Sequence, residues 1–414
     1  MELSFETGAV LLLIASVAAM LTRRLRLPYS AGLVAAGMGL AVLPFSPTVQ
    51  LTKDLLFTAL LPPLIFEAAF HLDWEQLRRD LGVVLVLASL GVALCAGVTA
   101  VGMHYLAHWD WLSCAVFGIL IAATDPVSVI ATFRETGARG RLVVLVEAEA
   151  LFNDGTAAVA FGVAVLFAAG HAPTPAQTLA TLIATVAGGV MCGVVVACGA
   201  LLLAGRTEDH LVEIAFTTVA AYGSFLFAQH LHLSGVLATL TAGLLMANYR
   251  SLGEISPRGK EAVEAFWEYA AFIANSLVFL LIGMHGAHAN LRAVWFSAAA
   301  AILLVTMGRA AAIYPCCLLF AWSPLRVSLK HQHVLFWGGL RGALALALAL
   351  GLPPEIPMRD SIVTISFAVV AFSVFVQGLT MPPLLRWLGE IPAAGYDQDE
   401  GGAGTPCVPR RRAP

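Results

Sequence analysis

Four polar side chains lie close together in a segment of the chain that is otherwise apolar. Within residues 147–154, Glu147, Glu149 and Asp154 supply three carboxylates and Asn153 supplies an amide. A charged side chain at the centre of a membrane helix costs roughly 2.5–3.5 kcal/mol on insertion scales, so such residues mark functional sites or ion pairs. This stretch is therefore the first candidate for a functional site.

The spacing of these groups divides them into different roles. Glu149 and Asn153 are four residues apart and share one face of a helix, whereas Asp154 points to a neighbouring face. Asp154 has no obvious cation near it in the sequence, and burial disfavours the charged form of a carboxyl group. Such a group can carry a proton near neutral pH and exchange it for a metal cation. Its all-oxygen setting suits Na+ or Li+. Glu147, nearer the inner end of the segment, is interpreted as an entrance residue.

A proline interrupts a second apolar segment, residues 112–134, in the sequence Thr124-Asp125-Pro126. Proline lacks an N–H group and disfavours helix at the residue before it, so we expect the backbone to open there. The carbonyl groups freed near Thr124 could then face a cation. Asp125 is expected either to compensate the exposed helix ends or to act as a local cap. Asn153 is suited to brace this broken helix.

A glycine-rich sequence, residues 338–342, interrupts the apolar segment 332–351 and carries Arg341. Glycines permit close approach of other groups, and an isolated buried charge costs far more than a hydrogen-bonded pair. We therefore predict a structural ion pair between Arg341 and Glu149. Arg309 also lies in an apolar segment and needs a partner, which the sequence does not identify.

One more carboxylate, Glu67, lies late in the apolar segment 52–71, after the pair Pro62-Pro63. It is expected either to join the site from the inner side of the membrane or to lie at an interface between helices. The pattern of the residues around it does not decide between these two roles.

The composition identifies the class of protein that carries these residues. Hydrophobic residues make up 59% of the chain and charged residues 12%, and the mean hydropathy is +0.85. Soluble domains carry about 25% charged residues, so we predict an all-α polytopic membrane protein. A net charge of −3 gives no reason to expect nucleic acid. The seven cysteines form no C-x-x-C pair, and neither a disulfide framework nor a metal site is indicated.

About thirteen segments are long and apolar enough to be transmembrane helices, since a spanning helix needs about 20 such residues. They fall near residues 7–22, 29–47, 52–71, 81–106, 112–134, 141–170, 177–204, 211–231, 234–249, 266–285, 293–321, 332–351 and 361–388.

Charge in the loops predicts how these segments are oriented. With the N-terminus outside, most Lys and Arg residues lie in loops on the inner side, as the positive-inside rule requires. The C-terminus is then cytoplasmic, and residues 391–414, rich in Gly, Pro and charge, are expected to be a disordered tail. Six helices, a connector and six more helices would form two inverted repeats, the common build of secondary transporters.

Several motifs, in this order and at membrane depth, resemble those of the sodium/proton antiporters of the NhaP and eukaryotic NHE type. The resemblance covers roughly residues 5–390. The motifs are Leu61-Pro-Pro-Leu-Ile-Phe-Glu67, Ala123-Thr-Asp-Pro-Val-Ser-Val129, Glu149-Ala-Leu-Phe-Asn-Asp154, Ser234-Gly-Val-Leu-Ala238, Ser276-Leu-Val-Phe-Leu-Leu-Ile-Gly283 and Gly338-Gly-Leu-Arg-Gly-Ala343.

The resemblance implies roles for individual residues. Asp154 is similar to the family's ion- and proton-binding aspartate, Thr124 to its broken-helix ligand, and Glu67 to a carboxylate at or near the ion site. Glu149 and Arg341 resemble the family's ion pair. The candidate ion- and proton-binding residues are thus Asp154, Thr124, Glu67, Asn153 and Asp125, and the first three are candidate ligands of transported Na+. No cofactor is implied.

The resemblance also implies an architecture and a stoichiometry. Family members have an NhaA-like fold with broken helices that cross at mid-membrane, and they are homodimers in the lipid bilayer. The core half would include helices near 52–170 and 293–388, and the remaining helices of residues 1–390 would form the dimerisation half. The pair Asn153-Asp154 is typical of electroneutral exchange, one proton for one cation. The expected location is the inner (plasma) membrane of the cell.

One position departs from the family pattern. The family usually has Ser after the glutamate, and its hydroxyl helps to ligate the ion, whereas this chain has Ala150. Potassium/proton exchange is therefore an alternative to sodium/proton exchange.

Two alternatives come from other classes of membrane protein. An intramembrane hydrolase would need a motif such as H-E-x-x-H or G-x-S-x-G, which this sequence lacks. An ion channel usually has a repeated filter loop on a symmetry axis, whereas this chain has two different helix breaks and a titratable carboxylate.

Overall fold

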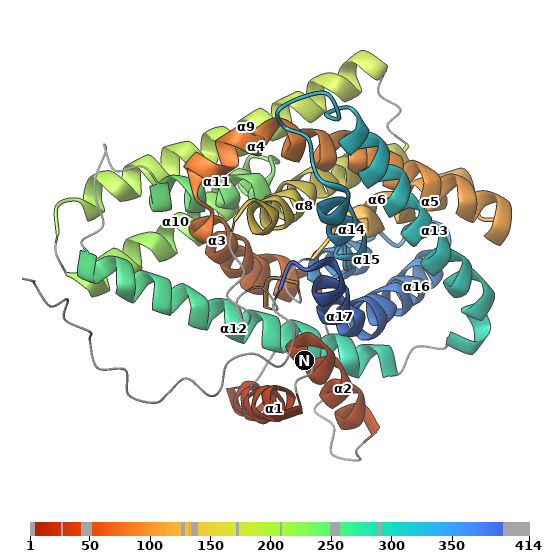
Figure 1. Cartoon of the computed structure of the whole chain (residues 1–414), viewed down its shortest axis with the longest axis horizontal. Helices are drawn as coiled ribbons and strands as arrows, with labels where there is room; N and C mark the ends of the chain where they lie inside the picture. The colour runs from red at the N-terminus through yellow and green to blue at the C-terminus, as the bar shows by residue number, and fades with distance from the viewer. Residues whose placement is uncertain are drawn as a thin grey trace, which may run out of the picture.

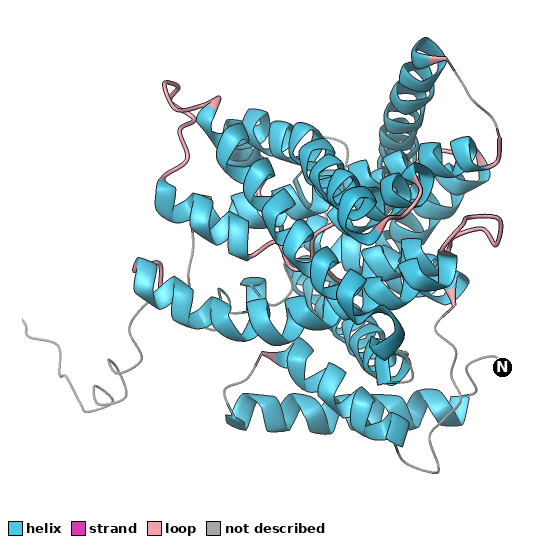
Figure 2. Cartoon of the chain, turned by 90° about the vertical axis from the view of Figure 1, so that its right-hand side faces the viewer, coloured by secondary structure: helices cyan, strands magenta, loops and turns pink. Residues whose placement is uncertain are grey.

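The computed structural model describes residues 5–25, 28–42, 52–125, 129–131, 133, 140–170, 174–207, 209–248, 257–287 and 291–391. Every regular element within these residues is a helix, as Figure 2 shows. This confirms the all-α class predicted from the sequence. The predicted tail lies outside the described residues except for Ile391, and so does Pro126.

Figure 1 labels the α-helices in the order in which they occur along the chain. The first group is α1 (Phe5–Leu25), α2 (Tyr29–Val42), the π-helical η1 (Leu55–Leu60), α3 (Leu61–His71), α4 (Trp74–Val86), η2 (Leu87–Gly91), α5 (Val92–Ala107), α6 (Trp111–Ala122) and α8 (Arg141–Ala168). The second group is α9 (Pro175–Ala204), α10 (His210–His230), α11 (Gly235–Asn248), α12 (Pro257–Ala287), α13 (Leu291–Leu318), α14 (Leu329–Trp337), α15 (Ala343–Leu350), α16 (Arg359–Phe372), η3 (Ser373–Gly378) and α17 (Leu379–Leu388).

Seven of the helical stretches described are long and apolar enough to cross a membrane. They are Trp74–Ala107, Arg141–Ala168, Ala176–Ala204, His210–His230, Gly259–Ala287, Val294–Leu318 and Arg359–Leu388. Five other apolar helices are shorter, at 10–17 residues. Each of the thirteen segments predicted from the sequence overlaps at least one helix of the structure. The number of membrane crossings stays a prediction.

Large apolar side chains remain exposed along the outer face of the long helix α9. Leu179, Ile183, Met191 and Val195 are all more than half exposed, and they recur at roughly helical spacing. A water-soluble monomer rarely presents so continuous an apolar face. A face of this kind suits contact with lipid, in agreement with a multi-pass membrane protein.

The two predicted helix breaks are confirmed, and they meet. Helix α6 ends at Ala122, and a non-helical stretch separates α14 from α15 after Trp337. The backbone N–H of Asp125 donates a hydrogen bond of 2.7 Å to the carbonyl oxygen of Leu340. This bond joins the two interruptions directly, although more than two hundred residues of sequence lie between them.

Glycines bring the helices around these breaks into close contact. On α2, a Cβ added at Gly37 would lie 2.1 Å from the carbonyl oxygen of Leu280 on α12, and one added at Gly283 would lie 2.2 Å from that of Val34. Small residues of this kind let helix backbones approach in membranes. The pair α2 and α12 therefore forms a tightly packed wall, seen at the bottom of Figure 1.

Candidate functional site

A cavity of about 380 Å³ opens where helices α3, α8, α12 and α15 face the break after α6. Five carboxylate side chains line it: Glu67, Asp125, Glu147, Asp154 and Glu268. Among the lining residues that the structure describes, none is Lys or Arg, and His71 is the one basic side chain. A cavity with charges of one sign concentrates ions of the opposite sign, so this one favours cations.

Asp154 lies at the deep end of a stripe that α8 presents to the cavity. Glu147, Ala150, Leu151 and Asp154 all line the cavity, and their spacing of three, four and seven residues places them on one helix face. One carboxylate oxygen of Asp154, Oδ1, is buried and has no hydrogen-bond partner within the described part of the chain. The structure thus brings Asp154 to the cavity with an oxygen free to bind a proton or an ion.

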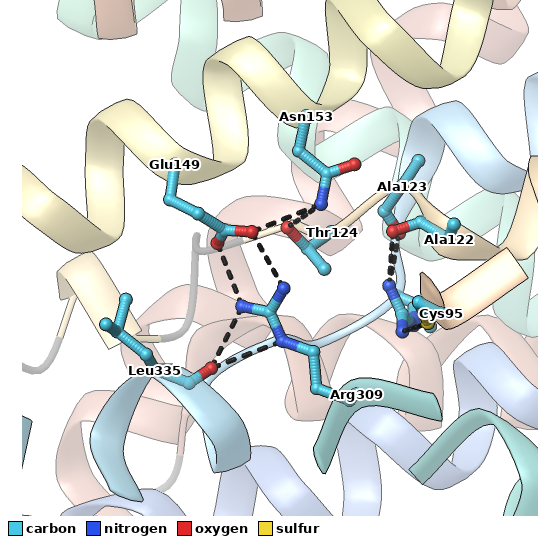
Figure 3. A network of polar contacts seen from close by, with 9 residues as sticks. Cys95, Ala122, Ala123, Thr124, Glu149, Asn153, Arg309 and Leu335 are labelled. Atoms are coloured by element: carbon cyan, nitrogen blue, oxygen red, sulfur yellow. Dashed lines mark hydrogen bonds and ion pairs between the residues drawn. The ribbon is translucent and has the colours of Figure 1, made fainter. Parts of the chain in front are cut away.

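Asn153 lies behind the cavity rather than in its lining. Its side-chain amide donates to the hydroxyl oxygen of Thr124 at 3.2 Å and to Oε1 of Glu149 at 3.3 Å (Figure 3). Thr124 itself lines the cavity next to Ala123. Asn153 therefore connects helix α8 to the broken end of α6, which is the contact expected of a brace.

Glu149 is paired with Arg309, not with Arg341, and the predicted ion pair is wrong in its partner. Two parallel hydrogen bonds join the groups, from Nη1 of Arg309 to Oε1 of Glu149 at 2.7 Å and from Nη2 to Oε2 at 2.8 Å (Figure 3). Nε and Nη2 of Arg309 also donate to the carbonyl oxygen of Leu335, at 3.3 and 2.9 Å. Bidentate geometry of this kind is the strong form of an arginine–carboxylate pair.

The glycine-rich break explains why Arg309 can reach this position. A Cβ added at Gly339 would lie 2.3 Å from Nε of Arg309, so only glycine leaves room for the guanidinium group. The sequence shows these glycines clearly, but it does not show which side chain occupies the space that they leave. Arg341 stands among the glycines themselves and was the nearest candidate.

Arg341 stabilises the broken end of α6 instead. Its Nη1 donates to the carbonyl oxygens of Ala122 and Ala123, at 2.7 and 3.0 Å, and Nη2 contacts Sγ of Cys95 at 3.5 Å. The last carbonyl groups of a helix have no partner within the helix and carry partial negative charge. Arg341, which is 1% exposed, supplies both the missing donors and a positive charge.

Asp125 places a negative charge at the start of α15, whereas Arg341 places a positive charge at the end of α6. A Cβ added at Gly342 would lie 1.9 Å from Oδ2 of Asp125, so the carboxylate packs directly on the residue that precedes α15. The first turn of a helix favours negative charge. Arg341, in the second break, thus brings a positive charge to the end of α6, and Asp125, in the first break, brings a negative charge to the start of α15. The sequence suggested such a role for Asp125 but not for Arg341.

Glu67 and Glu147 both line the cavity, which brings the predicted carboxylates together. Glu67 is 8% exposed, and its Oε1 lies 3.4 Å from Nδ1 of His71, one turn further along α3. Glu67 therefore lines the same cavity as Asp154 and Thr124.

Five polar lining residues had not been identified as site residues from the sequence. They are Thr22 on α1, Tyr29 on α2, His71 on α3, and Glu268 and Asn275 on α12. The signal for the last two was present, because residues 268, 271, 272 and 275 follow helical spacing. It was weak in the sequence, since Glu268 lies near the end of the apolar segment 266–285 and Asn275 is uncharged.

The family to which this chain belongs can be decided by comparison with known proteins. The family model described as "Sodium/hydrogen exchanger, transmembrane" matches residues 10–387, which include the whole cavity. The chain belongs to the sodium/hydrogen exchanger family. The exchanger is therefore a multi-pass membrane transporter and not an enzyme, which sets aside the hydrolase alternative.

Curated relatives and solved structures agree with this family. The exchanger is 38% identical to the Na(+)/H(+) antiporter ApNhaP of Aphanothece halophytica, over 88% of its own chain and 70% of that protein. It is 32% identical to the Na(+)/H(+) antiporter NhaH of Halobacillus dabanensis, over 92% and 97%. The structure of the sodium proton antiporter MjNhaP1 from Methanocaldococcus jannaschii matches with a TM-score of 0.71, at 19% identity, over 92% of the exchanger and 98% of that chain. That structural match shows that the fold is shared.

Proposed function

We propose that the exchanger moves Na+, or Li+, in exchange for H+, and that Asp154 binds the two in turn. The observation that carries this proposal is the buried Oδ1 of Asp154, which has no partner in the described residues and lies in a cavity lined by carboxylates. The relatives named as Na(+)/H(+) antiporters support the choice of ions.

Competition at one carboxylate is sufficient for antiport. The negative charge of Glu149 is balanced by Arg309 through two parallel hydrogen bonds. Asp154 has no such partner, so a proton or a cation must neutralise it before the site can cross an apolar environment. Thr124 and Glu67, which line the same cavity, are the further candidate ligands. A site in which Asp154 is charged and holds neither ion would stay on one side of the membrane. The site therefore returns only with the other ion bound, and this requirement couples the movements of Na+ and H+.

A ratio of one proton to one Na+ follows if Asp154 alone changes its charge. Asn153, beside it, is neutral and holds the break at Thr124. Exchange would proceed by alternating access, with helices near 52–170 and 293–388 moving against the others in a homodimer. Two inverted repeats would relate the two breaks, which are joined by the bond between Asp125 and Leu340. The N-terminus would lie outside and the C-terminus in the cytoplasm, across the plasma membrane.

K+ is a second candidate cation because of Ala150. This residue lines the cavity, is 2% exposed and offers no hydroxyl oxygen to a cation. Loss of one oxygen ligand weakens the preference for a small ion, which must give up more of its hydration shell on binding. The alternative keeps the same site and the same mechanism.

A transport assay in everted vesicles tests this function. A pH-sensitive dye should report proton movement when Na+ or Li+ is added across about pH 6 to 9, with K+ added separately. We expect the response to be the same whether the membrane potential is clamped at zero or left free, because no net charge moves. A response to K+ alone would select the alternative cation, and a clear dependence on potential would exclude one-for-one exchange.

A further inference from the structure

Helix α12 presents a polar stripe of its own to the cavity, on a wall formed by a different part of the chain from α8. The lining residues of α12 are Glu268, Ala271, Phe272 and Asn275. Their spacing of three, four and seven residues repeats the pattern of the α8 stripe, which runs from Glu147 to Asp154. Each helix thus places a carboxylate at the first position and an oxygen-bearing side chain seven residues later, about 10 Å further along the helix axis.

The two polar side chains of this stripe serve no visible structural purpose. In the part of the chain that is described, neither Glu268 nor Asn275 forms a hydrogen bond or an ion pair. Glu264, one turn before Glu268 on the same helix, behaves differently, since it lies 3.7 Å from Lys260 and does not line the cavity. Polar groups at a cavity wall in a membrane protein that stabilise nothing else are candidates for contact with the transported ion.

The stripe is held in a fixed orientation by the neighbouring helix α2. Tyr29 stacks on Phe272 with ring centroids 5.5 Å apart, and its hydroxyl group hydrogen-bonds to that of Ser276. The close packing of Gly37 and Gly283 fixes the same pair of helices. The face of α12 that carries Glu268 and Asn275 therefore points to the cavity because its other contacts are fixed.

We infer that α12 takes part in cation handling, with Glu268 attracting the cation at the cavity mouth and Asn275 supplying a neutral oxygen ligand deeper in the cavity. This inference rests on the proposed function. Glu268 is exposed, as a residue at an entrance must be, and Asn275 is half-buried. A neutral amide oxygen suits a hard monovalent cation, and it leaves the charge balance at Asp154 unchanged. Asn275 would offset the hydroxyl ligand that Ala150 does not provide.

The Glu268→Gln variant tests the first part of the inference. Removing one charge from the mouth should raise the apparent KM for Na+ about three- to tenfold at low ionic strength, because a negative cleft concentrates cations. The difference should shrink at high ionic strength, where exposed charges are screened, and Vmax should stay the same. Glu264→Gln, which removes the same charge one turn away, is the matched control and should leave KM unchanged. Equal KM values for Glu268→Gln and wild type at low ionic strength would overturn this role.

The Asn275→Leu and Asn275→Asp variants test the second part. Leu keeps the volume but removes the oxygen, so we expect the apparent KM for Na+ to rise about tenfold, the equivalent of one modest ligand interaction, with a different change for Li+ and K+. Asp retains an oxygen and should bind Na+ at least as well as wild type. A purely structural role would instead lower Vmax for all cations alike and would not be rescued by Asp.

The outcomes separate this inference from the proposed function. Wild-type exchange that is driven by Na+, together with unchanged KM and cation order in the Asn275 variants, would overturn the role of Asn275 and leave the antiporter intact. If Asn275→Leu does not accumulate in the membrane, Asn275→Asp still tests the inference. An apparent KM for Na+ in Asn275→Asp that is more than about tenfold above the wild-type value would contradict it. Absence of Na+-driven exchange in the wild type would instead reject the proposed function.

Discussion

Replacing Asp154 with Asn is expected to abolish cation-driven proton movement, leaving vesicles at the background of membranes without the exchanger. The amide is nearly the same size and shape as the carboxyl group, but it binds no proton and carries no negative charge. Because Oδ1 of Asp154 makes no hydrogen bond within the described residues, the substitution should break no structural contact. Expression and thermal stability should therefore match the wild type. The measurement is dye quench in everted vesicles with equal amounts of protein.

Asp360→Asn provides a matched control for this loss. Asp360 is almost fully exposed, at 98% of its side chain, and its one ion-pair partner in the described residues is Arg359. Removing its charge should leave exchange at the wild-type level. Exchange that persists in Asp154→Asn, with the control also active, would remove Asp154 from the mechanism.

Replacing Arg309 with Met is expected to cause the largest loss of stability. It leaves the carboxylate of Glu149, on a 2% exposed residue, without its cation and removes two donors from the carbonyl group of Leu335. Breaking a buried pair by removing one partner costs about 3–5 kcal/mol, which is a large fraction of typical folding stability. Size-exclusion fluorescence of heated detergent extracts should show much less folded protein. Arg359→Met, which removes a surface ion pair and one hydrogen bond to the carbonyl oxygen of Leu352, should cost only about 1–2 kcal/mol.

A second substitution at Glu149 should partly restore the Arg309→Met variant. With Glu149→Gln added, the buried site holds no uncompensated charge, so the double variant should be more stable than Arg309→Met alone. The same addition should give no such recovery to Arg341→Met, whose carbonyl partners remain at Ala122 and Ala123. Recovery of the Arg341 variant instead would mean that the pairing seen in the structure is not the one that matters for stability.

The sequence alone predicted the features that depend on local chemistry. A proline after Asp125 and three glycines close to Arg341 weaken the helix locally, and both breaks are found. The cost of charge in lipid marked residues 147–154 as a site, and helical spacing separated Asp154 from Glu149. These inferences need only a residue and its near neighbours in the chain.

The partner of Glu149 could not be predicted in this way. Glu149 and Arg309 are 160 positions apart in the sequence, and their meeting depends on how α8 and α13 pack. A buried Glu149 needs some cation as a partner because an isolated buried charge is costly, and the buried Arg309 and Arg341 meet that need equally well. Only the three-dimensional position of Gly339, which makes room for the Arg309 guanidinium group, decides between them.

The contribution of α12 was missed for a different reason. In a sequence, charges stand out when they lie deep within an apolar segment, where their cost is highest. Glu268 lies near a segment end, and Asn275 carries no charge, so neither stood out. Their importance comes from the cavity that they share with Asp154, and a cavity is a property of packing rather than of any one segment.

In the proposed mechanism, the carboxylate of Asp154 binds either a proton or a cation. Calorimetric titration of the purified exchanger with Na+, in buffers of different ionisation enthalpy, measures the number of protons released for each cation bound. We expect about one proton per Na+ at acidic pH, and an apparent Kd that weakens about tenfold for each unit of decrease in pH, since linkage between the two ligands is reciprocal. Neither effect should be present in Asp154→Asn. Binding of Na+ without proton release, at a Kd independent of pH, would contradict competition between the two ions at Asp154.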